Sequence, residues 1–365
     1  MVDNYNVNFP GDIMKHTIWL TAVAMLFVSL GSGQIFGQSA PYFQGKTILL
    51  VQGREPGGTG ALRAQAAIPF LKKYLPGEPT IVTQFMPGGG GRKATNFVAR
   101  NAKPDGLTFG NVGSGLVANA VLGSTGVEYD IDKLIYLGAS NSTAQYVFGS
   151  VARLGLDSLD KLRAHPGLRI GAQTVGHDIY INGRLFSWIL GLKEPKFITG
   201  YSGPELDLAM DRGELDARAN IPDTILQRNA EQIEKRSLNF HAIIQIPKDD
   251  RHPHPLFNKL PELESFATSE RERKIVTMFR TFRLVGSPYI LPPGTAAEAV
   301  AHWREAMRKT FRDPTFLKDF KRLSADDATP LLPEAQEKAI KDIPRDTDVI
   351  ALFNKIAGND PLPPR

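Results

Sequence analysis

The stretch VTQFMPGGGGRKATNFVAR, residues 82–100, places four consecutive glycines between an apolar run and a segment with helical spacing. Ala94, Phe97 and Val98 fall on one face of that segment, so the glycines stand where a strand gives way to a helix. Repeated glycine at such a corner lets the backbone approach another group closely. The first helical N–H groups lack intrahelical partners, so a backbone-lined anion site accounts for the run. The alternative is that the glycines only form tight turns.

The same unit of strand, glycine-containing corner and helix recurs along the chain without a fixed sequence period. It occurs at residues 48–75, 80–100, 168–190 and 196–213. Strands that alternate with helical patterns indicate an α/β fold. Several such corners together favour a binding site more strongly than one corner does.

Two nucleotide-binding motifs fail at the first corner. Gly53 and Gly58 have the spacing of a P-loop, but Thr59 stands where that loop needs lysine. Gly58 and Gly60 begin a dinucleotide fingerprint, but Arg63 stands where its third glycine belongs. We therefore expect no nucleotide and no other cofactor.

Composition excludes further classes of function. The 365 residues carry a formal net charge of +5, and no block of like charges indicates nucleic-acid binding. The absence of cysteine excludes disulfides, thiolate metal sites and cysteine nucleophiles. His252 and His254 flank a proline with no adjacent third ligand, so we expect a loop there and no metal site.

The N-terminal region has the pattern of a secretory signal peptide. Residues 14–40 begin with a short basic head, continue through an uncharged, mostly apolar stretch at 17–30 and end in small residues. Residues 1–40 are therefore interpreted as a signal peptide with an upstream extension, and Met14 as a possible true start. The alternative is an uncleaved anchor. Export would place the rest of the chain, which has no later long apolar run, in the periplasm.

Five stretches, in this order, carry a resemblance to a known family: PGGTG (56–60), MPGGGGRKATNFVARNAKPDGLTFG (86–110), YDIDKLIYLGASNS (129–142), FITGYSGPELDLAMDRGELDAR (197–218) and LPPGTAAEAVAHWREAMRKTFRDPTFLKDFKRL (291–323). The set is similar to the substrate-binding receptors of tripartite tricarboxylate transporters, the Bug-type extracytoplasmic solute receptors. It extends over almost the whole chain after the signal region.

The resemblance implies an α/β, periplasmic-binding-protein-like fold with two lobes and a ligand cleft between them. Residues 46–143 plus 284–365 would form lobe 1, and residues 144–283 would form lobe 2. Crossing strands near 140–150 and 280–287 would join the lobes as hinges.

The resemblance also implies a receptor that captures a small organic carboxylate and delivers it to membrane permease subunits, not an enzyme. We expect a monomer that closes around its ligand. Such receptors hold the ligand through backbone amides, small hydroxyls and waters more than through arginine. A periplasmic sensor accessory is the first alternative, and a secreted α/β hydrolase is the second. No nucleophile elbow supports the hydrolase, because neither Ser114 nor Ser202 lies in a G-x-S-x-G motif.

Carried over residue by residue, the resemblance places the ligand against corners of both lobes. The candidates are Gly57, Gly58, Thr59, Gly60, Gly88, Gly89, Gly90, Gly91, Ser114, Gly115 and Asn141 at lobe 1 and the crossing, and Thr174, Gly176, His177, Tyr201, Ser202 and Asp223 at lobe 2. His177 is also explained by an ordinary helix start.

The sequence departs from the family pattern in two places. Ala61 stands where an acid often follows the first corner, and Phe85-Met86 stands where asparagine often precedes the Pro-Gly pair. These departures bear on the ligand's identity more than on the fold. Residues 358–365, rich in proline and polar residues, are expected to be frayed.

Overall fold

The computed structural model describes Met1 and residues 40–365, apart from residues 55, 58, 114, 174, 325 and 326. The chain divides into two units, Met1–Pro41 and Tyr42–Arg365, and the following description concerns the second. The predicted signal peptide lies outside the described residues. Among the helices of the described part, none has the length and apolarity needed to cross a bilayer.

The first of two sheets joins the N-terminal strands to one strand from the C-terminal third of the chain. In spatial order it contains β2 (Thr80–Phe85), β1 (Thr47–Gln52), β3 (Thr108–Asn111), β10 (Tyr289–Leu291) and β4 (Ile135–Tyr136). Strand β1 runs parallel to both β2 and β3, while β10 is antiparallel to its neighbours. The carboxyl ends of β1, β2 and β3 therefore lie at one edge of the sheet.

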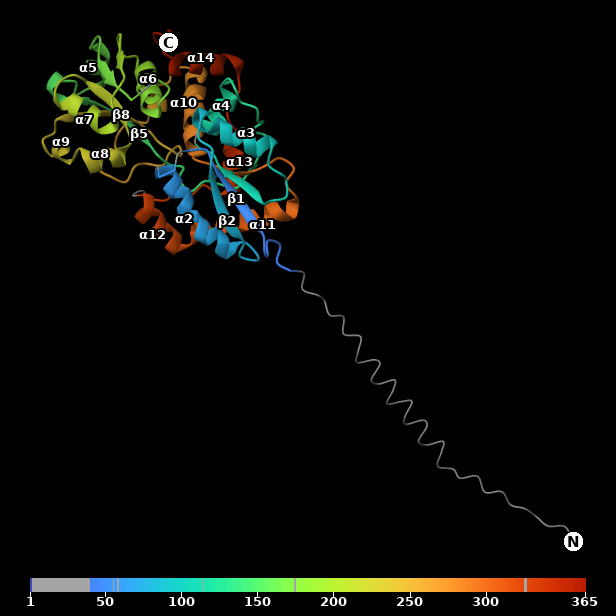
Figure 1. The fold of residues 1–365 in the computed structure, drawn as a ribbon. Coiled ribbons are helices and arrows are strands. Elements are labelled where there is room, and N and C mark those ends of the chain that lie inside the picture. Colours follow the sequence, from blue (N-terminus) through green and yellow to red (C-terminus); the bar gives the residue numbers. More distant parts are fainter. Residues whose placement is uncertain (2–39, 55, 58, 114, 174, 325–326) are drawn as a thin grey trace. The chain divides into compact units, whose positions relative to one another are not determined.

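The second sheet is built from the middle of the chain. Its order is β7 (Lys196–Ile198), β6 (Arg169–Gly171), β8 (Ala217–Asn220), β5 (Tyr146–Val151) and β9 (Leu238–Ile244). Strand β6 is parallel to β7 and β8, and β5 is antiparallel to β8 and β9. This mixed α/β arrangement with two sheets confirms the predicted fold class (Figure 1). The lobe boundaries themselves stay a prediction.

The helices follow the strands as the sequence pattern indicates. Before the long helix α10 (Glu270–Leu284) the chain forms α2 (Thr59–Tyr74), α3 (Arg92–Arg100), α4 (Gly115–Val121), α5 (Leu159–Ala164), α6 (Asp178–Leu190), α7 (Gly203–Asp211), α8 (Pro222–Arg228) and α9 (Ala230–Glu234). After it come α11 (Ala297–Arg312), α12 (Pro314–Ser324), α13 (Pro333–Lys341) and α14 (Thr347–Ala357). Short 3-10 turns are η1 (Gly89–Gly91), η2 (Ala152–Leu154) and η3 (Leu263–Phe266).

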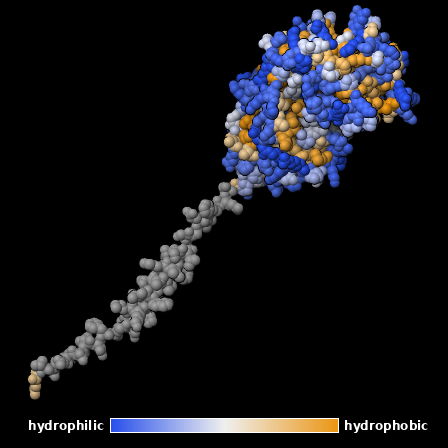
Figure 2. All heavy atoms as spheres, turned by 180° about the vertical axis from the view of Figure 1, so that it is seen from behind, coloured by the Kyte–Doolittle hydropathy of each residue, from blue (hydrophilic) through white to orange (hydrophobic). Residues whose placement is uncertain are grey.

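Buried apolar residues form two large clusters. One lies where α2, α11 and α12 pack beside the first sheet, and it is rich in aromatic rings such as Phe109, Trp303 and Phe316. The other is continuous from α3 and α4 through α10 and α14 to α6 and the second sheet. Helices α10 and α14 thus connect the hydrophobic cores of both sheets. Hydrophilic residues dominate the face shown in Figure 2, with apolar residues in smaller groups.

The expected crossing strand at 280–287 is wrong. Residues up to Leu284 belong to helix α10, whose N-cap Ser269 accepts a hydrogen bond from the Glu272 N–H. The apolar run continues into β10 without a change of composition, and the break comes at Gly286, which has a φ of 62°. Capping and the left-handed glycine, not hydrophobicity, separate the helix from the strand.

The expectation of a frayed C-terminus is also wrong. Residues 358–365 are fastened to helix α6 by side chains that donate to backbone carbonyls. The Tyr180 hydroxyl donates to the Gly358 carbonyl at 2.8 Å, and the Trp188 indole N–H donates to the Pro363 carbonyl at 3.0 Å. Proline-rich composition indicated a loose end, but long-range hydrogen bonds order it.

A buried serine and histidine pair in the second sheet gives a prediction on pH. The Ser150 hydroxyl lies 2.8 Å from the His241 Nε2, and burial lowers the pKa of His241 from 6.5 to about 4. His241 therefore binds a proton below about pH 6.5 in the unfolded chain, but in the folded chain it does so only near pH 4. The contribution of His241 to the free energy of unfolding is expected to be constant above pH 6.5 and to fall by up to about 3 kcal/mol as the pH approaches 4.

Urea denaturation at pH 7.5 and pH 5 measures this loss. In His241→Gln the pH-dependent part is expected to shrink, whereas in the half-buried control His165→Gln it is expected to persist. An unchanged pH dependence in His241→Gln would assign the effect to other groups.

Candidate functional site

Three glycine-containing corners meet at one edge of the first sheet because they follow its adjacent parallel strands. Gly53 follows β1, residues 88–91 follow β2, and Gly113 follows β3. The parallel register places all three at the carboxyl ends of the strands, where ligands of open α/β sheets bind.

All four glycines of residues 88–91 have positive φ, with values of 128°, 58°, 63° and 95°. L-residues avoid this region, so the run is required by its backbone conformation alone. Gly91 has a further constraint, since a Cβ added there would lie 1.9 Å from the Val112 carbonyl oxygen. Part of the glycine run therefore serves the contact between two backbones and not a ligand.

This contact predicts a difference between two alanine substitutions. Both Gly90→Ala and Gly91→Ala put a side chain into the left-handed region, at a cost of roughly 1–2 kcal/mol. At Gly90 the nearest neighbour would be the Asn119 Nδ2 at 3.8 Å, an ordinary contact. Gly91→Ala is expected to destabilise by about 2 kcal/mol more than Gly90→Ala, measured by urea denaturation. Equal losses would show that the corner moves freely away from Val112.

The corners open onto a cavity of about 640 Å³. Its lining comes from the edge of the first sheet, from α2 and α4, from the start of α6, and from α10 and α14. The lining residues are Gly53, Arg54, Arg63, Gly90, Val112, Gly113, Gly115, Ala118, Asn119, Leu122, Gly176, Asp178, Ile181, Phe279, Phe282, Arg283, Ser287 and Phe353. Three guanidinium groups and one carboxylate give this lining a formal charge of +2.

The structure brings three of the predicted residues together at this cavity, namely Gly90, Gly115 and Gly176. Gly58, Ser114, Thr174 and the side chain of Thr59 lie outside what the structure describes. The other candidates are not among the lining residues: Gly57, Gly60, Gly88, Gly89, Gly91, Asn141, His177, Tyr201, Ser202 and Asp223. A role for any of these residues in ligand binding stays a prediction.

Two lobe 2 candidates, Tyr201 and Ser202, lie at the start of α7, where the chain supplies its own anion. The Glu205 carboxylate accepts from the Ser202 N–H at 2.6 Å in a capping box, and that hydrogen bond lowers the pKa of Glu205. A ligand carboxylate at this helix start would have to compete with Glu205.

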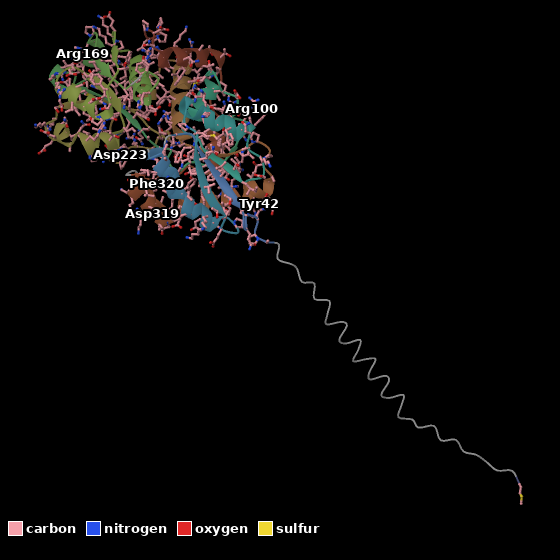
Figure 3. All side chains as sticks on the ribbon, in the orientation of Figure 1. Tyr42, Arg100, Arg169, Asp223, Asp319 and Phe320 are labelled. Atoms are coloured by element: carbon pink, nitrogen blue, oxygen red, sulfur yellow. The ribbon has the colours of Figure 1, made fainter. Side chains whose placement is uncertain are left out.

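Three further candidates have structural partners of their own. The His177 Nδ1 caps α6 by accepting from the Ile179 N–H at 3.2 Å, so the alternative of a helix start is observed, and desolvation lowers the pKa of His177. Asp223, labelled in Figure 3, lies in the first turn of α8; its Oδ1 is 3.4 Å from the His252 Nε2, and 83% of its side chain is exposed. Asn141 pairs with Thr329 through an isolated backbone bridge.

The start of α2 differs from that of α7, because its first turn contains no acidic residue. Instead the Arg54 guanidinium lies over Gly60, where an added Cβ would come within 2.1 Å of Nη1. Burial lowers the pKa of Arg54, and Arg63 nearby acts in the same direction. Of the described carboxylates, none forms an ion pair with Arg54. A helix N-terminus beside such a cation is a favourable place for an anion.

Arg283 contributes a third guanidinium, from the last turn of α10. Its Nη1 lies 2.6 Å from the Asp178 Oδ2, and its guanidinium carbon lies 5.5 Å from the centroid of the Tyr146 ring. Sequence reasoning expected backbone amides to meet the ligand's charge, and it missed these arginines. Arg54 stands two residues after an apolar strand, beside Gly53, which was a usable signal. Nothing local marks Arg283.

Solved structures resemble this fold, although no family model and no curated protein matches the chain. A TctC solute-binding protein from Polaromonas, solved without ligand, has a TM-score of 0.63 and 16% identity over 85% of this chain and 97% of that one. The periplasmic binding protein BugD has a TM-score of 0.51 and 16% identity over 86% and 98%. An R. palustris protein solved with adipate has a TM-score of 0.50 and 17% identity over 85% and 96%. The resemblance seen in the sequence is thus confirmed in three dimensions: the chain has the periplasmic-binding-protein fold of the TctC and Bug-type receptors.

Proposed function

We propose that this protein is an extracytoplasmic solute receptor that captures a small organic carboxylate and delivers it to a membrane permease. The observation that carries the proposal is the convergence of Arg54, Arg63 and Arg283 with three glycine corners on one cavity of about 640 Å³. That volume suits a small molecule, and the excess of positive charge suits an anion. The adipate bound to one structural neighbour supports carboxylates as the first ligands to test.

The cavity combines charge with an apolar wall. Ala118, Leu122 and Ile181 line it as half-buried residues, and Phe279 and Phe282, which are buried, line it as well. An anion bound here would lose water on one side and gain charge-assisted hydrogen bonds on the other. Micromolar affinity, about −8 kcal/mol, requires several such contacts to act together.

Hydrolysis is a weaker proposal because the serine and histidine pair of the second sheet has the wrong surroundings. Ser150 is fully buried, and the low pKa of His241 makes its imidazole a poor base at neutral pH. We propose that the protein works in the periplasm and that it releases its ligand without changing it chemically. Chromatography of the ligand after prolonged incubation with the protein tests this point.

Thermal-shift screening of the purified protein tests the main proposal. The panel contains mono-, di- and tricarboxylates, aromatic acids and amino acids, each beside its neutral amide. At least one carboxylate is expected to raise Tm by several degrees, because a ligand at a hundred times its Kd stabilises by about 2.7 kcal/mol. The matching amide is expected to leave Tm unchanged. A panel in which no carboxylate binds, or in which acids and amides bind alike, would contradict the proposal.

A further inference from the structure

The cavity already contains one carboxylate, that of Asp178, and it is bound to a guanidinium. The Arg283 Nη1 and the Asp178 Oδ2 are 2.6 Å apart, and both residues line the cavity. Asp178 comes from the first turn of α6, and Arg283 comes from the last turn of α10. The pair therefore joins the helix that follows β6 of the second sheet to the helix that precedes β10 of the first sheet.

The two partners of this pair differ in how firmly they are held. Arg283 has 17% of its side chain exposed and lies against the ring of Tyr146. Its helix is fixed one turn earlier, where Arg280 forms ion pairs with both Glu262 and Glu264. The guanidinium is thus kept in place by contacts that do not involve Asp178.

Asp178 is held less firmly than Arg283. Its side chain is 43% exposed, and it stands at a helix N-terminus, where a carboxylate remains stabilised by backbone amides and water without a cationic partner. The carboxylate can leave the pair at low cost, whereas the guanidinium cannot.

We propose that Asp178 is a specificity-determining residue that holds Arg283 until a second anionic group of the ligand replaces it. This inference rests on the proposed function. One carboxylate of the ligand binds beside Arg54, and that binding tethers the second carboxylate at high effective concentration near Arg283. A free monoanion reaches Arg283 only at its bulk concentration. It must displace Asp178, which the chain holds beside Arg283. The receptor therefore selects acids with two anionic groups.

The experiment compares the tightest-binding dicarboxylate of the screen with its own half-amide, which has the same size and one charge fewer. Calorimetry on the unaltered protein is expected to give at least tenfold tighter binding of the diacid. Asp178→Asn is expected to tighten the diacid at least fivefold and the half-amide by less. Arg283→Met is expected to bring the two ligands within threefold of each other.

Asp319→Asn on α12 is the matched control, since it removes one negative charge outside the cavity. It is expected to leave both affinities unchanged, and thermal unfolding without ligand verifies that every variant is folded. If acids bind but the half-amide equals the diacid, or Asp178→Asn weakens the diacid, the inference is wrong while the receptor proposal stands. If no acid binds, the receptor proposal falls first, and the inference falls with it.

Discussion

Replacing Arg54 with methionine is expected to weaken carboxylate binding at least a hundredfold while the fold remains intact. Charge-assisted hydrogen bonds contribute about 1.5–3 kcal/mol each, and tenfold in affinity corresponds to about 1.4 kcal/mol. Burial already disfavours the Arg54 charge, as its lowered pKa indicates. Methionine keeps most of the apolar stem of arginine. The urea midpoint of Arg54→Met is therefore expected to be unchanged or slightly higher.

A second substitution tests whether Arg54 acts from the position that the structure gives it. Gly60 lies inside α2 without a positive φ, so alanine suits its backbone, yet its Cβ would collide with the Arg54 guanidinium. Gly60→Ala is expected to displace the guanidinium and to lower affinity at least tenfold without loss of stability. In the Arg54→Met background the same substitution is expected to have no further effect, because the group it displaces is gone.

Calorimetric titration of the four proteins, unaltered, Arg54→Met, Gly60→Ala and the double variant, completes the cycle. Additive losses would mean that Gly60 contacts the ligand directly, as the family resemblance implied, and not through Arg54. Arg54→Met with full affinity would remove this corner from the binding site.

The contrast between Gly60 and Gly91 shows how much of the site the sequence could predict. Glycine after an apolar strand predicted both corners, because strand ends and helix starts are local patterns. The neighbours of each glycine are not local. Gly91 meets the carbonyl of Val112, which lies in the corner after β3, and Gly60 makes room for Arg54. A glycine needed for packing and a glycine needed for a binding side chain look identical in the sequence.

The same limit applies to the helix starts. Corners before α2 and α7 have similar patterns, and both were predicted to bind the ligand. Only the hydrogen bond that the Ser202 N–H donates to the Glu205 carboxylate shows that the chain supplies its own anion at the start of α7. Likewise Asp178 and Arg283 come from separate helices, and only the packing of α10 brings them into one cavity.

Replacing Arg184 with methionine is expected to destabilise the protein by about 4 kcal/mol and to release residues 358–365. The Arg184 side chain is 2% exposed, and its Nη2 donates to the Asp360 carbonyl at 2.6 Å. It also donates to the Lys355 and Ile356 carbonyls, which lie in the last turn of helix α14. A cation at a helix C-terminus satisfies carbonyls that the helix leaves without partners.

The expected loss is large because three acceptors lose their donor at once. Each buried acceptor left unsatisfied costs about 1–3 kcal/mol, so detachment of the segment into water limits the loss. Detachment would expose the indole of Trp188, whose N–H donates to the Pro363 carbonyl. The variant is therefore expected to show both a lower urea midpoint and a change in tryptophan fluorescence before global unfolding.

Carboxypeptidase digestion followed by mass spectrometry distinguishes release of this segment from a general loss of stability. Trimming within residues 358–365 is expected to be fast in Arg184→Met and slow in the unaltered protein. The matched control is Arg100→Met, which removes a guanidinium that is 59% exposed and paired with Glu128, and which is expected to cost less than 1 kcal/mol (Figure 3). Equal trimming of both variants would mean that Arg184 does not hold the C-terminal segment. A loss of stability without trimming would assign its effect to the packing of its guanidinium on Phe197 instead.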